Sequence, residues 1–156
     1  MDSKTNVLYV DVGGGSTEIT IFSKGKILTS KSFKIGTVRL LNDKKEFRRI
    51  WQTIEIWIKE NTKSLKNIAV IGSGGNINKI FKLSGKPMGT PLTLMYMKNY
   101  LEFLSKMTYE DRIRNLDLNP DRADVIIPAS KIYVATMEWS GATKIYVPKI
   151  GLADGI

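Results

Sequence analysis

The eight residues Asp11-Val12-Gly13-Gly14-Gly15-Ser16-Thr17-Glu18 lie between two apolar stretches, Val7–Val10 and Ile19–Phe22. This pattern predicts two strands joined by a glycine turn. Three consecutive glycines let the backbone adopt positive φ and bring amide N–H groups close to an anion. No helical pattern follows, and the Lys-Ser or Lys-Thr pair of the strand-to-helix phosphate loops is missing. The segment is therefore expected to be a hairpin that binds phosphate.

Two carboxylates bracket the glycines, Asp11 at the end of the first strand and Glu18 at the start of the second. A carboxylate suits a phosphate site where a divalent cation or a water lies between them. We therefore predict that Asp11 and Glu18 are catalytic and metal-binding residues; a turn-capping aspartate and a solvated glutamate are the alternative. The residues expected to donate backbone and hydroxyl hydrogen bonds to phosphate are Gly13, Gly14, Gly15, Ser16 and Thr17.

Composition restricts the available chemistry. The chain has 156 residues, enough for one domain with a core, and contains neither cysteine nor histidine. Disulfides, thiolate metal sites and imidazole catalysis are therefore excluded. Carboxylates, hydroxyls, lysine and arginine remain, together with a hard cation held by oxygen ligands, so the expected cofactor is Mg²⁺, with Mn²⁺ or Ca²⁺ as alternatives.

The net charge of +9 suits a polyanionic partner such as polyphosphate or a nucleotide. The lysines are scattered, and no basic run is interleaved with aromatic residues, so specific nucleic-acid binding is not expected. The sequence shows no signal peptide and no apolar run long enough to cross a bilayer. We expect a cytoplasmic protein without a membrane partner.

The pattern beyond the hairpin alternates strands and helices. A turn at 23–26 and a third strand over 27–33 complete an N-terminal meander, and apolar residues at three- and four-residue spacing predict a helix over 43–65. Two tryptophans of that helix are expected in the core. Further helices are expected over 93–107, from Thr108, and over 119–139, where Pro128 should kink the helix or mark a shortened first turn. A last strand at 145–148 leads to a glycine-rich loop.

A second glycine loop follows the predicted buried strand at 67–71 and precedes a helix around 77–81. A strand, a glycine turn and a helix N-terminus form an arrangement that favours anions. Close packing of the helix on the strand would require glycines too. The candidate phosphate-binding residues of this loop are Gly72, Ser73, Gly74 and Gly75, with Asn76 as a further candidate.

Four segments, in order along the chain, resemble the exopolyphosphatase / guanosine pentaphosphate phosphohydrolase (Ppx/GppA) family. They are Lys34-Ile35-Gly36-Thr37-Val38-Arg39-Leu40, Ile71-Gly72-Ser73-Gly74-Gly75-Asn76-Ile77, Arg122-Ala123-Asp124-Val125-Ile126-Ile127-Pro128-Ala129 and Gly151-Leu152-Ala153-Asp154-Gly155. The hairpin itself is also similar to turns of Hsp70-like chaperones and bacterial actins. The resemblance implies a ribonuclease H-like, actin-like α/β domain, with a mixed sheet, three antiparallel N-terminal strands and flanking helices.

The resemblance also implies that residues 1–156 form one domain, the second half of a two-domain phosphatase core cut from a longer protein. Such an enzyme releases terminal orthophosphate from inorganic polyphosphate or guanosine pentaphosphate. The general base of the family precedes the hairpin and has no counterpart here, so the isolated chain is expected to be inactive without the first domain.

Several residues of these segments leave alternatives open. Arg39 could contact a phosphate or form an ion pair with an acidic residue such as Asp124, and Asp154 could complete the cleft. Ala129 replaces a usual glycine of the family. Ala153 replaces an arginine that is common in the family.

Two other functions remain compatible with the sequence. The chain could be half of an ATPase or kinase of the actin-like superfamily, or a non-catalytic nucleotide-binding or assembly module. An apolar face that awaits the missing half would also favour a homodimer.

Overall fold

The computed structural model describes residues 5–37 and 44–148, which form a mixed six-stranded sheet with five helices. The elements in chain order are β1 (Asn6–Val12), β2 (Thr17–Ser23), β3 (Lys26–Phe33), α1 (Lys44–Thr62), β4 (Ile68–Ser73), α2 (Gly75–Ser84), β5 (Leu92–Thr93), α3 (Leu94–Ser105), α4 (Tyr109–Leu116), α5 (Pro120–Ser140) and β6 (Lys144–Tyr146).

The strand order across the sheet is β3-β2-β1-β4-β6-β5. Strands β1, β2 and β3 form an antiparallel meander, as predicted, while β4 lies parallel to β1 and β6 parallel to β4. The β2–β3 turn consists of Lys24 and Gly25, with φ of 54° and 78°. Two successive left-handed residues match the right-handed twist of a hairpin, which explains the short loop. Strand β5, two residues long, was not predicted.

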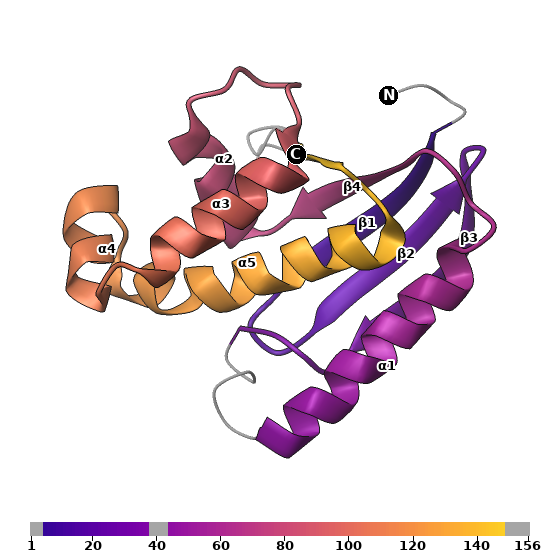
Figure 1. Cartoon of the computed structure of the whole chain (residues 1–156), viewed down its shortest axis with the longest axis horizontal. Helices are drawn as coiled ribbons and strands as arrows, with labels where there is room; N and C mark the ends of the chain where they lie inside the picture. Colours follow the sequence, from indigo (N-terminus) through magenta and orange to yellow (C-terminus); the bar gives the residue numbers. More distant parts are fainter. Residues whose placement is uncertain (1–4, 38–43, 149–156) are drawn as a thin grey trace, which may run out of the picture.

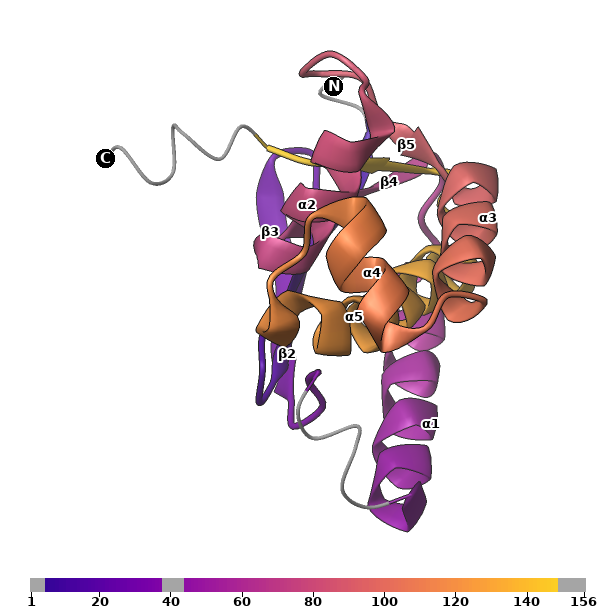
Figure 2. The same ribbon diagram turned by 90° about the vertical axis from the view of Figure 1, so that its left-hand side faces the viewer.

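Alternating side chains divide the sheet into two faces. Leu8 and Val10 of β1 and Ile19 and Ile21 of β2 are buried on one face. Helix α5 contacts β1 and β4, and α1 contacts α5. Figures 1 and 2 show α1 and α5 together on one side of the sheet. The intervening positions, Asp11 among them, point to the opposite face.

Helix α5 forms the centre of the helical layer, and eleven of its 21 residues are buried. The helix begins as predicted, with Pro120 in the first turn and the Asn119 side chain accepting a hydrogen bond from the Arg122 amide at 2.7 Å. It continues through Pro128, where a kink or a shortened first turn was expected. Asp124, four residues earlier, is exposed, so water can satisfy the carbonyl that Pro128 leaves unpaired.

The tryptophans pack inward, as predicted. The rings of Trp51 and Trp139 join α1 to α5 with their centroids 5.0 Å apart, and Trp57 contacts Phe33 of β3 at 5.5 Å. Both contacts are edge-to-face, the geometry that aromatic pairs favour. They fix α1 over the N-terminal meander.

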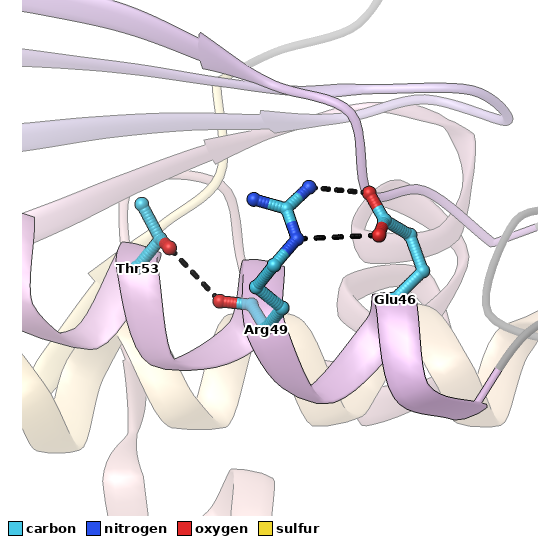
Figure 3. A network of polar contacts seen from close by, with 3 residues as sticks. All are labelled: Glu46, Arg49 and Thr53. Carbon is cyan, nitrogen blue, oxygen red and sulfur yellow. Dashed lines mark hydrogen bonds and ion pairs between the residues drawn. The ribbon is translucent and has the colours of Figure 1, made fainter.

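The outer face of α1 carries a small polar network (Figure 3). The Arg49 guanidinium donates two hydrogen bonds to the Glu46 carboxylate, and the Thr53 hydroxyl donates to the Arg49 carbonyl at 2.8 Å. Arg49 and Glu46 are 68% and 50% exposed. Ion pairs this exposed contribute little to stability, so α1 is held mainly by its inner face.

Asn119→Ala should lower the free energy of unfolding by about 1 kcal/mol, because it removes the side-chain cap of the most buried helix. Urea unfolding followed by tryptophan fluorescence measures the change. Asn115→Ala, at an exposed position inside α4, is the matched control and should change the free energy by less than about 0.5 kcal/mol. Equal effects of the two substitutions would contradict the capping role.

The predicted helices and strands are confirmed in type, with ends that differ by one to three residues at most of the boundaries that were predicted. Within the described residues, no helix is long and apolar enough to cross a membrane. Arg39, Ala153 and Asp154 lie outside the part of the chain that the structure describes.

Candidate functional site

The glycine hairpin brings the two predicted carboxylates side by side. Asp11 and Glu18 are cross-strand partners in the register of β1 and β2, so their side chains lie on the same face of the sheet. Both side chains reach solvent, and neighbouring residues cover part of Asp11. The Ser16 hydroxyl donates a hydrogen bond to Glu18 Oε1 at 2.8 Å, which orients that carboxylate within the hairpin.

The surroundings of Asp11 disfavour its charged form. Partial burial raises the pKa of Asp11 above its ordinary value, and the neighbouring Glu18 charge raises that pKa further. A hydrogen bond with the Ser73 side chain acts in the opposite direction. Two adjacent carboxylates in this position would be stabilised by a cation that offsets their repulsion.

The carboxylate pair fits a magnesium site completed by other ligands. Within residues 5–37 and 44–148, no three Asp, Glu, His or Cys side chains lie together so that they could hold a metal ion by themselves. Mg²⁺ commonly binds through one or two carboxylates and takes its other ligands from water and substrate phosphates. Asp11 and Glu18 therefore suit a cation that arrives with a phosphate chain.

The segment after β3 packs against the backbone of the hairpin through Gly36 and Thr37. The Thr37 amide donates to the Gly13 carbonyl at 3.1 Å, and a Cβ added at Gly36 would lie 2.6 Å from the carbonyl oxygens of both Gly13 and Gly14. A side chain at Gly36 would thus displace the hairpin. This contact explains the glycine in the predicted family segment.

The structure corrects three details of the predicted hairpin. The Thr17 side chain is fully buried and its hydroxyl donates to the Ile35 carbonyl at 2.7 Å, so this hydroxyl faces away from the exposed carboxylates. The Gly13 amide donates to the Ser16 carbonyl at 2.9 Å. Positive φ among the described glycines occurs at Gly25, Gly74, Gly85, Gly89 and Gly141, none of them in the hairpin. The hairpin backbone is therefore constrained by its close contact with Gly36 and not by a positive φ.

The second glycine loop lies directly beside the hairpin. Strands β1 and β4 are neighbours, with Asp11 opposite Ser73 in the register. Gly74 has a φ of 126°, and a Cβ there would lie 3.1 Å from the Val12 carbonyl oxygen and 3.6 Å from Asp11 Oδ1. The structure thus brings the two predicted loops together around the Asp11 carboxylate.

The start of α2 holds an unpartnered hydrogen-bond acceptor and, close to it, a cationic side chain. Asn76 is 6% exposed, and its Oδ1 has no hydrogen-bond partner among the described residues. The Arg122 guanidinium lies so close to Gly75 that an added Cβ would overlap it. No role was predicted for Arg122, although this residue opens one of the family-like segments and follows the predicted cap of α5.

Tyr133 was also missed, because a tyrosine within an apolar helix resembles any other core residue. Its side chain is fully buried. The hydroxyl donates to the Ser73 carbonyl at 2.5 Å and accepts from the Val12 amide at 3.4 Å. Burial is the main cause that raises the pKa of Tyr133, so the hydroxyl stays protonated.

The mixed sheet with its flanking helices matches solved structures of actin-like phosphatase domains. The chain belongs to the Ppx/GppA phosphatase family, which it matches over residues 1–156.

The relatives that this chain matches are considerably longer than the chain itself. It is 32% identical over 168 aligned residues to the bifunctional 3-dehydroquinate synthase/phosphatase of Fusobacterium nucleatum, covering 94% of this chain and 25% of that protein. The Ppx/GppA family member of Aquifex aeolicus is 25% identical with a TM-score of 0.75, over 97% of this chain and 55% of that one. An exopolyphosphatase from Cytophaga hutchinsonii shares the fold at 18% identity and a TM-score of 0.77, over 98% and 58% of the two chains. The chain therefore spans about half the length of these solved relatives.

Proposed function

We propose that this chain is the second half of a Mg²⁺-dependent phosphoanhydride hydrolase that releases terminal orthophosphate from inorganic polyphosphate or guanosine pentaphosphate. The observation that carries the proposal is the adjacent pair Asp11 and Glu18 on a glycine hairpin, in a chain of the Ppx/GppA phosphatase family. The name of the Fusobacterium nucleatum relative includes a phosphatase activity, which supports the same class of reaction.

The hairpin would bind the terminal phosphate. Backbone amides from Gly14 to Ser16 would donate to phosphate oxygens and stabilise the charge that develops on them in the transition state. Asp11, held by Ser73, orients the attacking water, while Glu18, held by Ser16, is the second carboxylate of the cation site. When bound, Mg²⁺ supplies charge neutralisation between these carboxylates and the phosphate.

The second glycine loop would bind the next part of the substrate. Gly72 to Gly75 lead into the N-terminus of α2, where unpaired amides favour a phosphate. The unpartnered Oδ1 of Asn76 could accept a hydrogen bond from a bound water or a substrate hydroxyl, and Arg122 lies beside the loop. This arrangement suits a chain of phosphates better than a single one.

The reaction also needs groups that the described residues do not supply. A general base and a second phosphate loop would come from the preceding domain of the core. We infer that the two halves enclose the substrate between them. A cytoplasmic location remains part of this proposal.

The decisive experiment measures orthophosphate release by a longer version of the protein that extends upstream through the first domain. Polyphosphate, guanosine pentaphosphate and ATP are compared with and without Mg²⁺, and the 156-residue chain is assayed beside it. We expect Mg²⁺-dependent release from polyphosphate or guanosine pentaphosphate by the longer protein alone. Comparable turnover by the short chain would refute the two-domain site, and release from no substrate would refute the hydrolase.

A further inference from the structure

Tyr133 reaches the functional site from the middle of the helical layer. Helix α5 contacts both β1 and β4 and crosses them in Figure 1. The Tyr133 hydroxyl lies where these two strands end, next to the points at which the two glycine loops begin. The reaction described above makes no use of this buried group.

The Tyr133 hydroxyl lies beside the last hydrogen bond of the β1–β4 ladder. In a parallel pair, alternate residues of one strand donate to the residue that precedes their partner. Asn6 follows this rule, since it is paired with Ile68 and donates to the Asn67 carbonyl at 3.2 Å. The same phase directs the Val12 amide toward the Ser73 carbonyl, where the register ends. The Tyr133 hydroxyl contacts both groups, because it accepts from the Val12 amide and donates to the Ser73 carbonyl.

The hydroxyl therefore links the two strand ends, with bonds of 3.4 Å to the Val12 amide and 2.5 Å to the Ser73 carbonyl. Gly13 follows Val12 and Gly74 follows Ser73. A Cβ at Gly74 would lie 3.2 Å from the Tyr133 hydroxyl and 3.6 Å from Asp11 Oδ1. The hydroxyl thus fixes the spacing of both loops around the Asp11 carboxylate.

We propose that Tyr133 is a positioning residue, whose hydroxyl bridges the ends of β1 and β4 and couples the two glycine loops around Asp11. The expected effect on turnover rests on the proposed hydrolase function. The effect on the loops is independent of it. Tyr133→Phe is the direct test, because it removes one oxygen atom and keeps the ring that packs in the core.

The first measurement is amide hydrogen exchange by NMR in the 156-residue chain. In Tyr133→Phe, the Val12 amide loses its contact with the hydroxyl and should exchange about tenfold faster, and the Gly74 and Gly75 amides should change with it. The Leu8 and Val10 amides should keep their rates. Tyr146→Phe, which removes a hydroxyl from half-buried β6, is the control and should leave all these rates unchanged. An equal acceleration of every β1 amide would overturn the proposal, since it would indicate only a loss of global stability.

The second measurement is orthophosphate release by the longer protein described above. A misplaced Asp11 carboxylate should lower kcat about tenfold or more and leave KM within about twofold. Unchanged kcat would overturn the positioning role even if amide exchange changes locally. If the wild-type protein releases no orthophosphate, the proposed function fails, and the exchange measurement alone decides whether Tyr133 couples the loops.

Discussion

Asp11→Asn should abolish orthophosphate release by the longer protein while making the folded domain more stable at neutral pH. Asp11 has the proposed roles of orienting water and binding the cation, so its loss should lower kcat by about 100-fold to 1000-fold. The stability gain follows from the raised pKa of Asp11, whose ionised form is disfavoured by burial and by Glu18.

The sign of the pH dependence follows from this shift. Because the folded-state pKa of Asp11 lies above the ordinary value of 3.8, the folded chain binds more protons than the unfolded chain in the pH range just above that value. Stability therefore falls as the pH rises through this range. Asp11→Asn removes that contribution, so its advantage in unfolding free energy should be largest at neutral pH and should shrink below pH 3.8.

Urea unfolding at several pH values, together with the phosphate assay, tests both statements. Asp117→Asn makes the same chemical change at an exposed left-handed position, with a φ of 53°, that asparagine also accepts. This control should keep wild-type turnover and stability. Wild-type turnover of Asp11→Asn, or a stability advantage that grows at acidic pH, would contradict the assigned environment of Asp11.

Gly36→Ala should be the most destabilising of these single substitutions, with a loss of about 3 kcal/mol in the free energy of unfolding. The new Cβ would lie 2.6 Å from the carbonyl oxygens of Gly13 and Gly14. Both are backbone atoms, so no side chain can rotate away and the hairpin itself must move. The longer protein carrying Gly36→Ala should therefore also lose phosphatase activity.

Gly13→Ala is the matched control for stability. It adds the same methyl group to the same hairpin, but the Cβ would meet only the Ser16 carbonyl oxygen at 3.4 Å, an ordinary contact distance. The change in unfolding free energy should stay within about 0.5 kcal/mol. Similar urea midpoints for the two variants would show that the close contact between Gly36 and the hairpin does not determine the free energy of unfolding.

Much of the fold could be predicted from local patterns. The meander follows from alternation of apolar residues around the hairpin and from the Lys24-Gly25 turn. The start of α5 follows from Asn119 and Pro120, because a capping side chain and a proline act within one turn. Its passage through Pro128 could not be predicted locally, since burial of a long helix outweighs one missing hydrogen bond.

The candidate site was predictable only in part. Asp11 and Glu18 are close in sequence across a short turn, so their pairing follows from the hairpin register. The placement of Tyr133, 121 residues from Val12, depends on how α5 docks onto the sheet. The hydrogen bond of the Thr17 hydroxyl likewise depends on the chain after β3, because its acceptor is the Ile35 carbonyl. Local patterns contain no information about either contact.

The bridge made by Tyr133 has a consequence for the order of folding. Its two hydrogen bonds join Tyr133 to Val12, which is 121 positions away in the sequence, and to Ser73, which is 60 positions away. The β1–β2 hairpin, in contrast, closes over a few residues. Local contacts form before distant ones because closing a long loop costs more chain entropy. We therefore expect the meander to form early and the two glycine loops to reach their final spacing only after α5 docks. A chain halted before that step would contain the carboxylate pair without the geometry that binds a substrate.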